Sequence, residues 1–191
     1  LFVPDRAHFS LPIFDQPDLK APFSLTLEIP SEWVAVANGV EVSQELLDGG
    51  RTRYTYRETK PIPTYLLAFA VGGFQIEEAE QGGRTFRMFH RETDTAKVAR
   101  NLDAVFDLHA TALDWLEDYT QIEYPYGKFD FVLLPPFQYG GMEHPGSIFY
   151  RQQSLLLDES ATQNQIIGRA SLIAHETSHQ WFGDLVTMAW F

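Results

Sequence analysis

The chain has 191 residues, 45% of them hydrophobic, with a formal net charge of −12 and no Cys. This length is enough to bury the core of one domain or of two small ones. The negative charge argues against a nucleic-acid partner, and the lack of Cys excludes disulfides and thiolate metal sites, so any metal must be held by His and carboxylates. No apolar run is long enough to predict a membrane-spanning helix.

The chain starts at Leu1 without Met and without a signal-like segment. We therefore expect an internal piece of a longer protein. The absence of Cys fits the cytosol, which we favour, and also fits an exported bacterial protein.

The first part of the chain, to about residue 76, has the patterns of β-strands. Apolar and polar residues alternate with period two, and turn residues such as Asn38-Gly39 and Asp48-Gly49-Gly50 separate the runs. The predicted strands are Phe23–Ile29, Trp33–Val42, Arg51–Arg57 and a continuous apolar run, Tyr65–Val71, expected to be buried.

The pattern changes near Gln75. A hairpin is predicted through Gly82-Gly83, and apolar residues at three-and-four spacing predict a helix from Thr95 to Tyr119. Three further strands are predicted at Phe129–Leu134, Ser147–Tyr150 and Ser154–Leu157. The second part is therefore mixed α/β.

The last predicted element is an apolar, buried helix of about twenty residues that carries the motif H-E-x-x-H. Asp158 or Ser160 is its expected N-cap, with Ser160 and Gln163 at capping-box spacing, and Gly183 is its expected stop.

In the motif, His175 and His179 lie four residues apart, so both imidazoles project from one face of the helix and reach one Zn²⁺. Glu176 follows the first His and is the expected general base that accepts a proton from the attacking water. The plainer alternative is a pair of surface histidines beside a solvated Glu.

A second motif, Gly140-Gly141-Met142-Glu143-His144, lies about thirty residues upstream. Together with H-E-x-x-H-Q-W-F-G it makes the chain resemble the aminopeptidase N family of zinc peptidases (gluzincins), which includes leukotriene A hydrolase. The stretches from Asp15 to Phe23, from Thr64 to Gly72 and from Leu185 to Met188 match as well. The resemblance therefore runs along essentially the whole chain.

The resemblance implies an α+β fold in two parts. Residues 1–76 would be the C-terminal part of an N-terminal β-domain, with an antiparallel sheet or sandwich. Residues 77–191 would be the first half of a thermolysin-like zincin catalytic domain.

The resemblance also assigns roles in the second motif. Glu143 would pair with the free α-ammonium of the substrate, which fixes cleavage one residue from the N-terminus. Gly140, Gly141 and Met142 would bind the substrate backbone as an edge strand does. His144 stands where the family usually has Asn; a His there could keep the same hydrogen bond, but it can also titrate near neutral pH.

The expected activity is zinc-dependent removal of N-terminal residues from peptides. Two alternatives stay open: epoxide opening at the same zinc, as in leukotriene A hydrolase, and a non-catalytic scaffold. The family's third zinc ligand, a Glu, would lie beyond Phe191. We therefore expect this stretch alone to bind zinc weakly or not at all and to have little or no activity. We also expect it either to self-associate through apolar surface around Met188 or to have a poorly ordered C-terminus.

Overall fold

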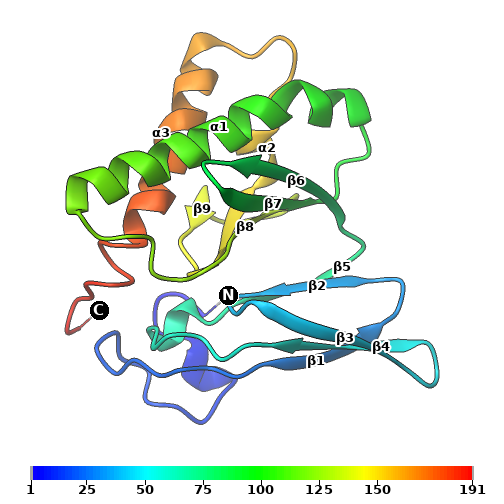
Figure 1. The fold of residues 1–191 in the computed structure, drawn as a ribbon, viewed down its shortest axis with the longest axis vertical. Helices are drawn as coiled ribbons and strands as arrows, with labels where there is room; N and C mark the ends of the chain where they lie inside the picture. Colours follow the sequence, from blue (N-terminus) through cyan, green and yellow to red (C-terminus); the bar gives the residue numbers. More distant parts are fainter. Residues whose placement is uncertain (1, 191) are drawn as a thin grey trace.

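The structure is a computed structural model and describes residues 2–190. Its centre is a five-stranded sheet, with the two long helices on one face and two smaller sheets on the other (Figure 1). The β-rich first part and the mixed second part confirm the expected α+β class.

The first part of the chain forms the two smaller sheets. One is antiparallel, in the order β1-β4-β3, and the other pairs β2 with β5. Their bounds are β1 Thr26–Pro30, β2 Val34–Ala37, β3 Glu41–Leu47, β4 Arg51–Tyr56 and β5 Phe69–Gly72. Short 3₁₀ turns, η1 (Ala7–Phe9) and η2 (Thr64–Leu66), lie in the same part.

The five-stranded sheet has the order β6-β7-β8-β10-β9. The β7-β8 and β8-β10 pairs are parallel, whereas β6 and β9 pair antiparallel at the two edges. The bounds are β6 Gln75–Gln81, β7 Arg84–His90, β8 Phe129–Leu134, β9 Gly141–Met142 and β10 Ser147–Arg151. The short strand β9 thus places the second motif at a sheet edge.

Three helices complete the second part: α1 (Thr95–Thr120), α2 (Gln152–Leu155) and α3 (Gln163–His179). Asp94 caps α1 by accepting from the Lys97 N–H at 3.0 Å, and Gln121 ends it in the left-handed conformation. The packing of α1 against α3 positions the H-E-x-x-H helix over the sheet.

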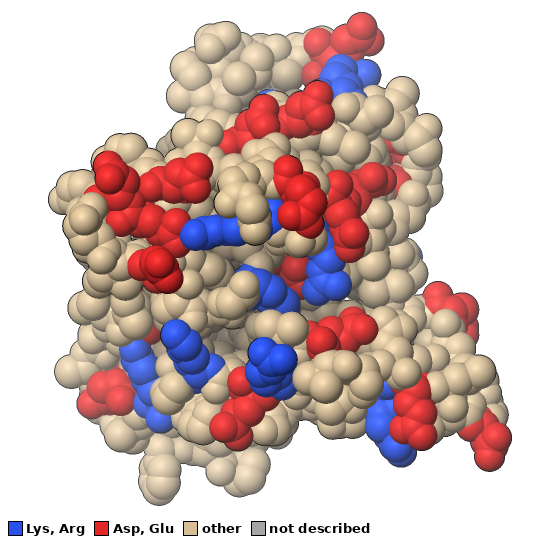
Figure 2. All heavy atoms as spheres, in the orientation of Figure 1, with Lys and Arg blue, Asp and Glu red and all other residues tan. Residues whose placement is uncertain are grey.

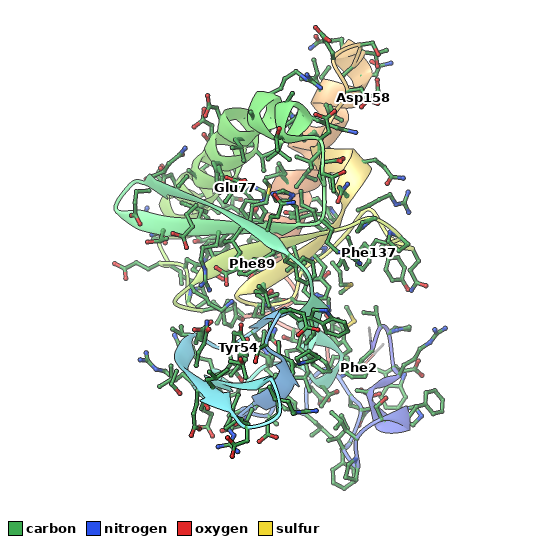
Figure 3. All side chains as sticks on the ribbon, turned by 90° about the vertical axis from the view of Figure 1, so that its right-hand side faces the viewer. Phe2, Tyr54, Glu77, Phe89, Phe137 and Asp158 are labelled. Atoms are coloured by element: carbon green, nitrogen blue, oxygen red, sulfur yellow. The ribbon has the colours of Figure 1, made fainter. Side chains whose placement is uncertain are left out.

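The five-stranded sheet is buried on both faces because its central strands are apolar at successive positions. In β8, Phe131 and Leu133 pack in the cluster that includes the helices, whereas Val132 packs with Val36 and Phe89 toward the smaller sheets. Figure 3 shows Phe89 near the boundary between the two parts, with Tyr54 below it among the smaller sheets. The cluster that contains Val36, Phe89 and Val132 therefore joins the two parts.

Several element predictions are wrong. Ser154–Leu157 is not a strand: its first residues end helix α2, which turns the chain from β10 toward α3. The run from Tyr65 to Val71 is divided between η2 and β5, because the chain turns at Leu67 and Ala68, and Phe69 is exposed.

The N-cap of α3 is Thr162 rather than Asp158 or Ser160, and the helix ends at His179, before Gly183. It is also less buried than expected: Ile166 is 41% and Ile167 56% exposed. Tyr119 of α1 is exposed as well.

Charge is unevenly distributed on the face shown in Figure 2. Asp and Glu gather over α1 and the β6-β7 hairpin, whereas Lys and Arg are concentrated across the middle and lower part. Much of the acidic surface on this face therefore belongs to α1 and its neighbouring hairpin. Within residues 2–190, no helix has the length and hydropathy needed to cross a membrane.

Candidate metal centre and substrate site

Helix α3 is fixed at its start by a capping box and along its length by one buried stripe. Thr162 accepts from the Gln165 N–H at 3.3 Å, and the Gln165 side chain accepts from the Thr162 N–H at 2.8 Å. Its buried residues are Arg169, Ile173, Glu176 and Thr177, which recur at helical spacing on the inner face. His175 is consequently exposed and His179 half-buried, on a side that solvent reaches.

The two histidines of the motif converge. Nε2 of His175 lies 3.1 Å from Nε2 of His179. Nδ1 of His179 lies 3.0 Å from the carbonyl oxygen of Phe182. Since a carbonyl only accepts, Nδ1 carries the proton in the neutral ring, and Nε2 presents its lone pair toward His175.

This arrangement fits zinc chemistry. Two nitrogens held at 2.0–2.1 Å by one tetrahedral ion lie about 3.3 Å apart, close to the separation of this pair. A ring N–H donated to a carbonyl is the usual outer support of a zinc-binding His. Within residues 2–190, no group of three or more His, Cys, Asp and Glu side chains is arranged to hold a metal.

Glu176 lies beneath the second motif and is 4% exposed. A Cβ added to Gly141 would lie 2.5 Å from its Cδ, so only a glycine allows this approach of backbone and carboxyl. Burial, followed by the charge of Glu143, raises the pKa of Glu176 to about 8. A cation at the imidazoles would act in the opposite direction. The charges of Glu143 and Glu176 thus disfavour each other.

Strand β9 holds the second motif against β10. Gly141 pairs with Tyr150 and Met142 with Phe149, and the Gly140 carbonyl accepts from the Arg151 N–H at 2.9 Å. Because β9 is the last strand of its sheet, its outer edge is not used for pairing within that sheet.

His144 differs from its expectation. The ring is fully buried against Phe149, and neither ring nitrogen has a hydrogen-bond partner within residues 2–190. Burial lowers its pKa to about 3, so the ring is neutral at physiological pH. The prediction of a retained side-chain hydrogen bond and of titration near neutrality is therefore wrong, because the corner is apolar.

Sequence reasoning missed the residues that join the two motifs to each other and to the first part of the chain. Gln180, at the end of α3, donates to the Glu143 carbonyl at 2.8 Å. Asn38, which follows β2, donates to the carbonyls of Pro145 at 2.9 Å and Leu66 at 3.0 Å, and accepts from the Ala68 N–H at 2.7 Å. An Asn-Gly dipeptide signals only a turn, so no sequence pattern predicts this buried role.

Comparison with known proteins decides the family. The sequence model of the peptidase family M1 domain matches residues 104–191, and that of the peptidase M1 N-terminal domain matches residues 2–66. The chain belongs to peptidase family M1. This agrees with the resemblance to zinc aminopeptidases that its two motifs carry.

Named M1 relatives match the chain along nearly its whole length. Aminopeptidase M1 of Arabidopsis thaliana is 36% identical over 196 residues, covering 100% of this chain and 21% of the relative. Glutamyl aminopeptidase of Mus musculus is 37% identical over 98% of this chain, and aminopeptidase M1-B of Oryza sativa subsp. japonica is 40% identical over 94%. The chain spans about a fifth of the length of these relatives.

Proposed function

We propose that the protein containing this chain is a zinc-dependent aminopeptidase. The observation that carries the proposal is the convergence of the His175 and His179 Nε2 atoms, 3.1 Å apart, beside the buried carboxyl of Glu176. Membership of M1 and the names of the aminopeptidase relatives support the same reaction class.

His175 and His179 would hold the metal. Zinc, when bound, acidifies a coordinated water and polarises a carbonyl. Glu176 would take the proton released as the water attacks the scissile carbonyl and pass it to the leaving amine. Its close contact with Gly141 keeps this carboxyl in one place.

Glu143 would bind the α-ammonium of the substrate by a charge-assisted hydrogen bond. Gly140, Gly141 and Met142 would hydrogen-bond the substrate backbone along the outer edge of β9. The position of β9 at the sheet edge, beside Glu176, supports this assignment.

The test is an assay of the full-length protein on aminoacyl-anilides. We expect cleavage that a chelator abolishes and added zinc restores, and no cleavage of the matched N-acetylated anilides, which lack the ammonium group. The variant His179→Ala should lose both zinc and activity, whereas His8→Ala, an exposed histidine of the first part, should keep both.

Two outcomes would overturn the proposal. Zinc-dependent hydrolysis of an epoxide without anilide cleavage would favour the leukotriene-A-hydrolase-like alternative. Failure to cleave any substrate in the presence of zinc would favour a scaffold.

We also propose that the domain boundary lies at residues 76–77. The change of sheet lies close to this position, because β5 ends at Gly72 and pairs back with β2, whereas β6 starts at Gln75, just before the proposed boundary, and belongs to the five-stranded sheet. Weak zinc affinity and self-association of the isolated 191-residue chain stay predictions, to be measured by calorimetry and light scattering.

A further inference from the structure

The loop that follows α3, residues 180–187, contacts the ring of His179. It folds back on the helix end: the Asp184 N–H donates to the His179 carbonyl at 3.0 Å, and the Val186 N–H donates to the Trp181 carbonyl at 2.9 Å. This fold brings the Phe182 carbonyl to Nδ1 of His179. The direction of Nε2 therefore depends on where the loop lies.

A lysine from the other end of the chain holds this loop. The Lys20 ammonium donates to the Asp184 carbonyl at 2.6 Å and to the Leu185 carbonyl at 3.0 Å, across 164 and 165 residues. Burial lowers the pKa of Lys20, and the nearby Asp184 carboxyl opposes that shift. The ammonium is thus partly desolvated, which strengthens its hydrogen bonds to the two carbonyls.

The backbone around Lys20 is itself fixed. Ala21 and Ile62 exchange two hydrogen bonds of 3.1 and 3.0 Å as an isolated antiparallel bridge. Five residues before Lys20, the Asp15 carboxylate accepts from the Thr64 hydroxyl at 2.7 Å. Lys20 therefore contacts the loop from a segment whose backbone is held in place by hydrogen bonds. The contact can thus fix the position of the loop.

We propose that Lys20 is a positioning residue for the metal-binding imidazole of His179, acting through the loop 180–187. The ammonium keeps the carbonyls of Asp184 and Leu185 in place, the loop keeps the Phe182 carbonyl in place, and that carbonyl orients the ring. The inference rests on the proposed zinc site. It makes the first, β-rich part of the chain a contributor to metal affinity.

The test compares zinc dissociation constants of full-length variants by competition with a chromogenic chelator. Substitutions in the outer shell of a zinc-binding His typically weaken affinity 10- to 100-fold. Lys20 acts one contact further out, so we expect Lys20→Met to weaken affinity about 10-fold and Lys20→Arg, which still donates to two carbonyls, to restore most of it. Zinc-saturated Lys20→Met should recover most of its kcat.

Lys60→Met is the matched control, because Lys60 is an exposed lysine of the same part of the chain. A Lys20→Met variant with the zinc affinity of Lys60→Met, even with a lower thermal midpoint, would show a merely structural role and overturn the inference. If Lys20→Met fails to fold, the comparison is made between Lys20→Gln and Lys20→Arg. Equal zinc affinities of these two variants would overturn the inference. Should His179→Ala itself keep zinc, the proposed zinc site is wrong, and the role of Lys20, which rests on that site, is overturned with it.

Discussion

The two halves of the proposed site are built in different ways. The proposed metal half, His175 and His179, lies on one helix, and spacing along that helix brings the imidazoles together. The proposed amine half, residues 140–146, has almost no regular structure of its own and is held by distant contacts. The first half is thus encoded locally, whereas the second depends on the whole fold.

The contacts of the amine half come from several elements. Asn38 binds the Pro145 carbonyl, Gln180 binds the Glu143 carbonyl, and the Lys128 ammonium donates to the Gly146 carbonyl at 2.6 Å. Each contact crosses between segments far apart in sequence, except that of Lys128. Substitutions should therefore affect the two halves independently. Some should lower kcat without changing zinc affinity, and others should weaken substrate binding alone.

The largest expected effect is that of Glu176→Gln. The amide keeps the shape of the buried side chain but cannot accept the proton, so kcat should fall about 10³-fold, within the range for loss of a general base. Zinc content, measured by atomic absorption, should stay at the wild-type level. Glu159→Gln, at an exposed site before α3, is the control. Retained activity in Glu176→Gln would remove Glu176 from the mechanism.

Gly141→Ala tests the contact between the two halves. The new Cβ would overlap the Glu176 carboxyl, so the loop or the base must move, and we expect kcat/KM to fall about 10²-fold, as for a misplacement of about 1 Å. At Gly140 the new Cβ would meet Cδ1 of Leu172 at 3.3 Å and Cδ2 at 3.8 Å, which form the movable end of a side chain. Gly140→Ala should therefore be milder, and equal losses in the two variants would contradict this geometry.

Asn38→Leu tests the amine half alone. It leaves the carbonyls of Leu66 and Pro145 and the N–H of Ala68 without their partner, which costs about 1–3 kcal/mol for each buried group left unsatisfied. We expect a lower thermal midpoint and a higher KM for free-amine substrates, with zinc affinity unchanged. Asn164→Leu, an exposed Asn in the first turn of α3, provides the comparison.

The smallest expected effect is a loss of order in residues 140–146 at low pH, when Asp130 becomes protonated. Burial opposes ionisation of this carboxyl, but Lys128 and Arg87 outweigh it and lower the pKa of Asp130 below its ordinary value of 3.8. Its contribution to stability is therefore complete above pH 3.8 and is lost as the pH falls through the lower folded pKa.

Lys128 bridges Asp130, at 2.7 Å, to the Gly146 carbonyl, so loss of this charge should loosen the loop. Hydrogen exchange of the metal-free protein should show that residues 140–146 lose protection as the pH falls below 3.8, before the inner face of α3 does. Asp130→Asn should produce the same pattern at neutral pH. Uniform loss of protection over both halves would contradict the prediction.

The sequence predicted what depends on near neighbours. The period-two and three-and-four patterns located β4, β8, β10 and α1 within a few residues, and the spacing of His175 and His179 predicted their shared face. The cap of α3 was misplaced because Asp158, Ser160 and Thr162 are all good capping residues, and only the course of the chain selects Thr162.

Contacts across more than a hundred residues could not be predicted. Nothing in the local pattern of Asn38 or Lys20 indicates that their side chains reach Pro145 and Asp184. Similarly, the apolar surroundings that keep His144 neutral come from the packing of Phe149 and its neighbours, which a single sequence does not reveal.

Strand β9 has a direction, and direction restricts how a peptide can lie on it. The strand runs from Gly141 toward Glu143, so a ligand paired antiparallel with it has its first residue beside Glu143 and its following carbonyl back toward Gly141, where Glu176 lies. A ligand in the opposite orientation would present its carboxyl end to Glu143, where like charges repel. The polarity of one two-residue edge would thus select which terminus of a polypeptide enters the site first.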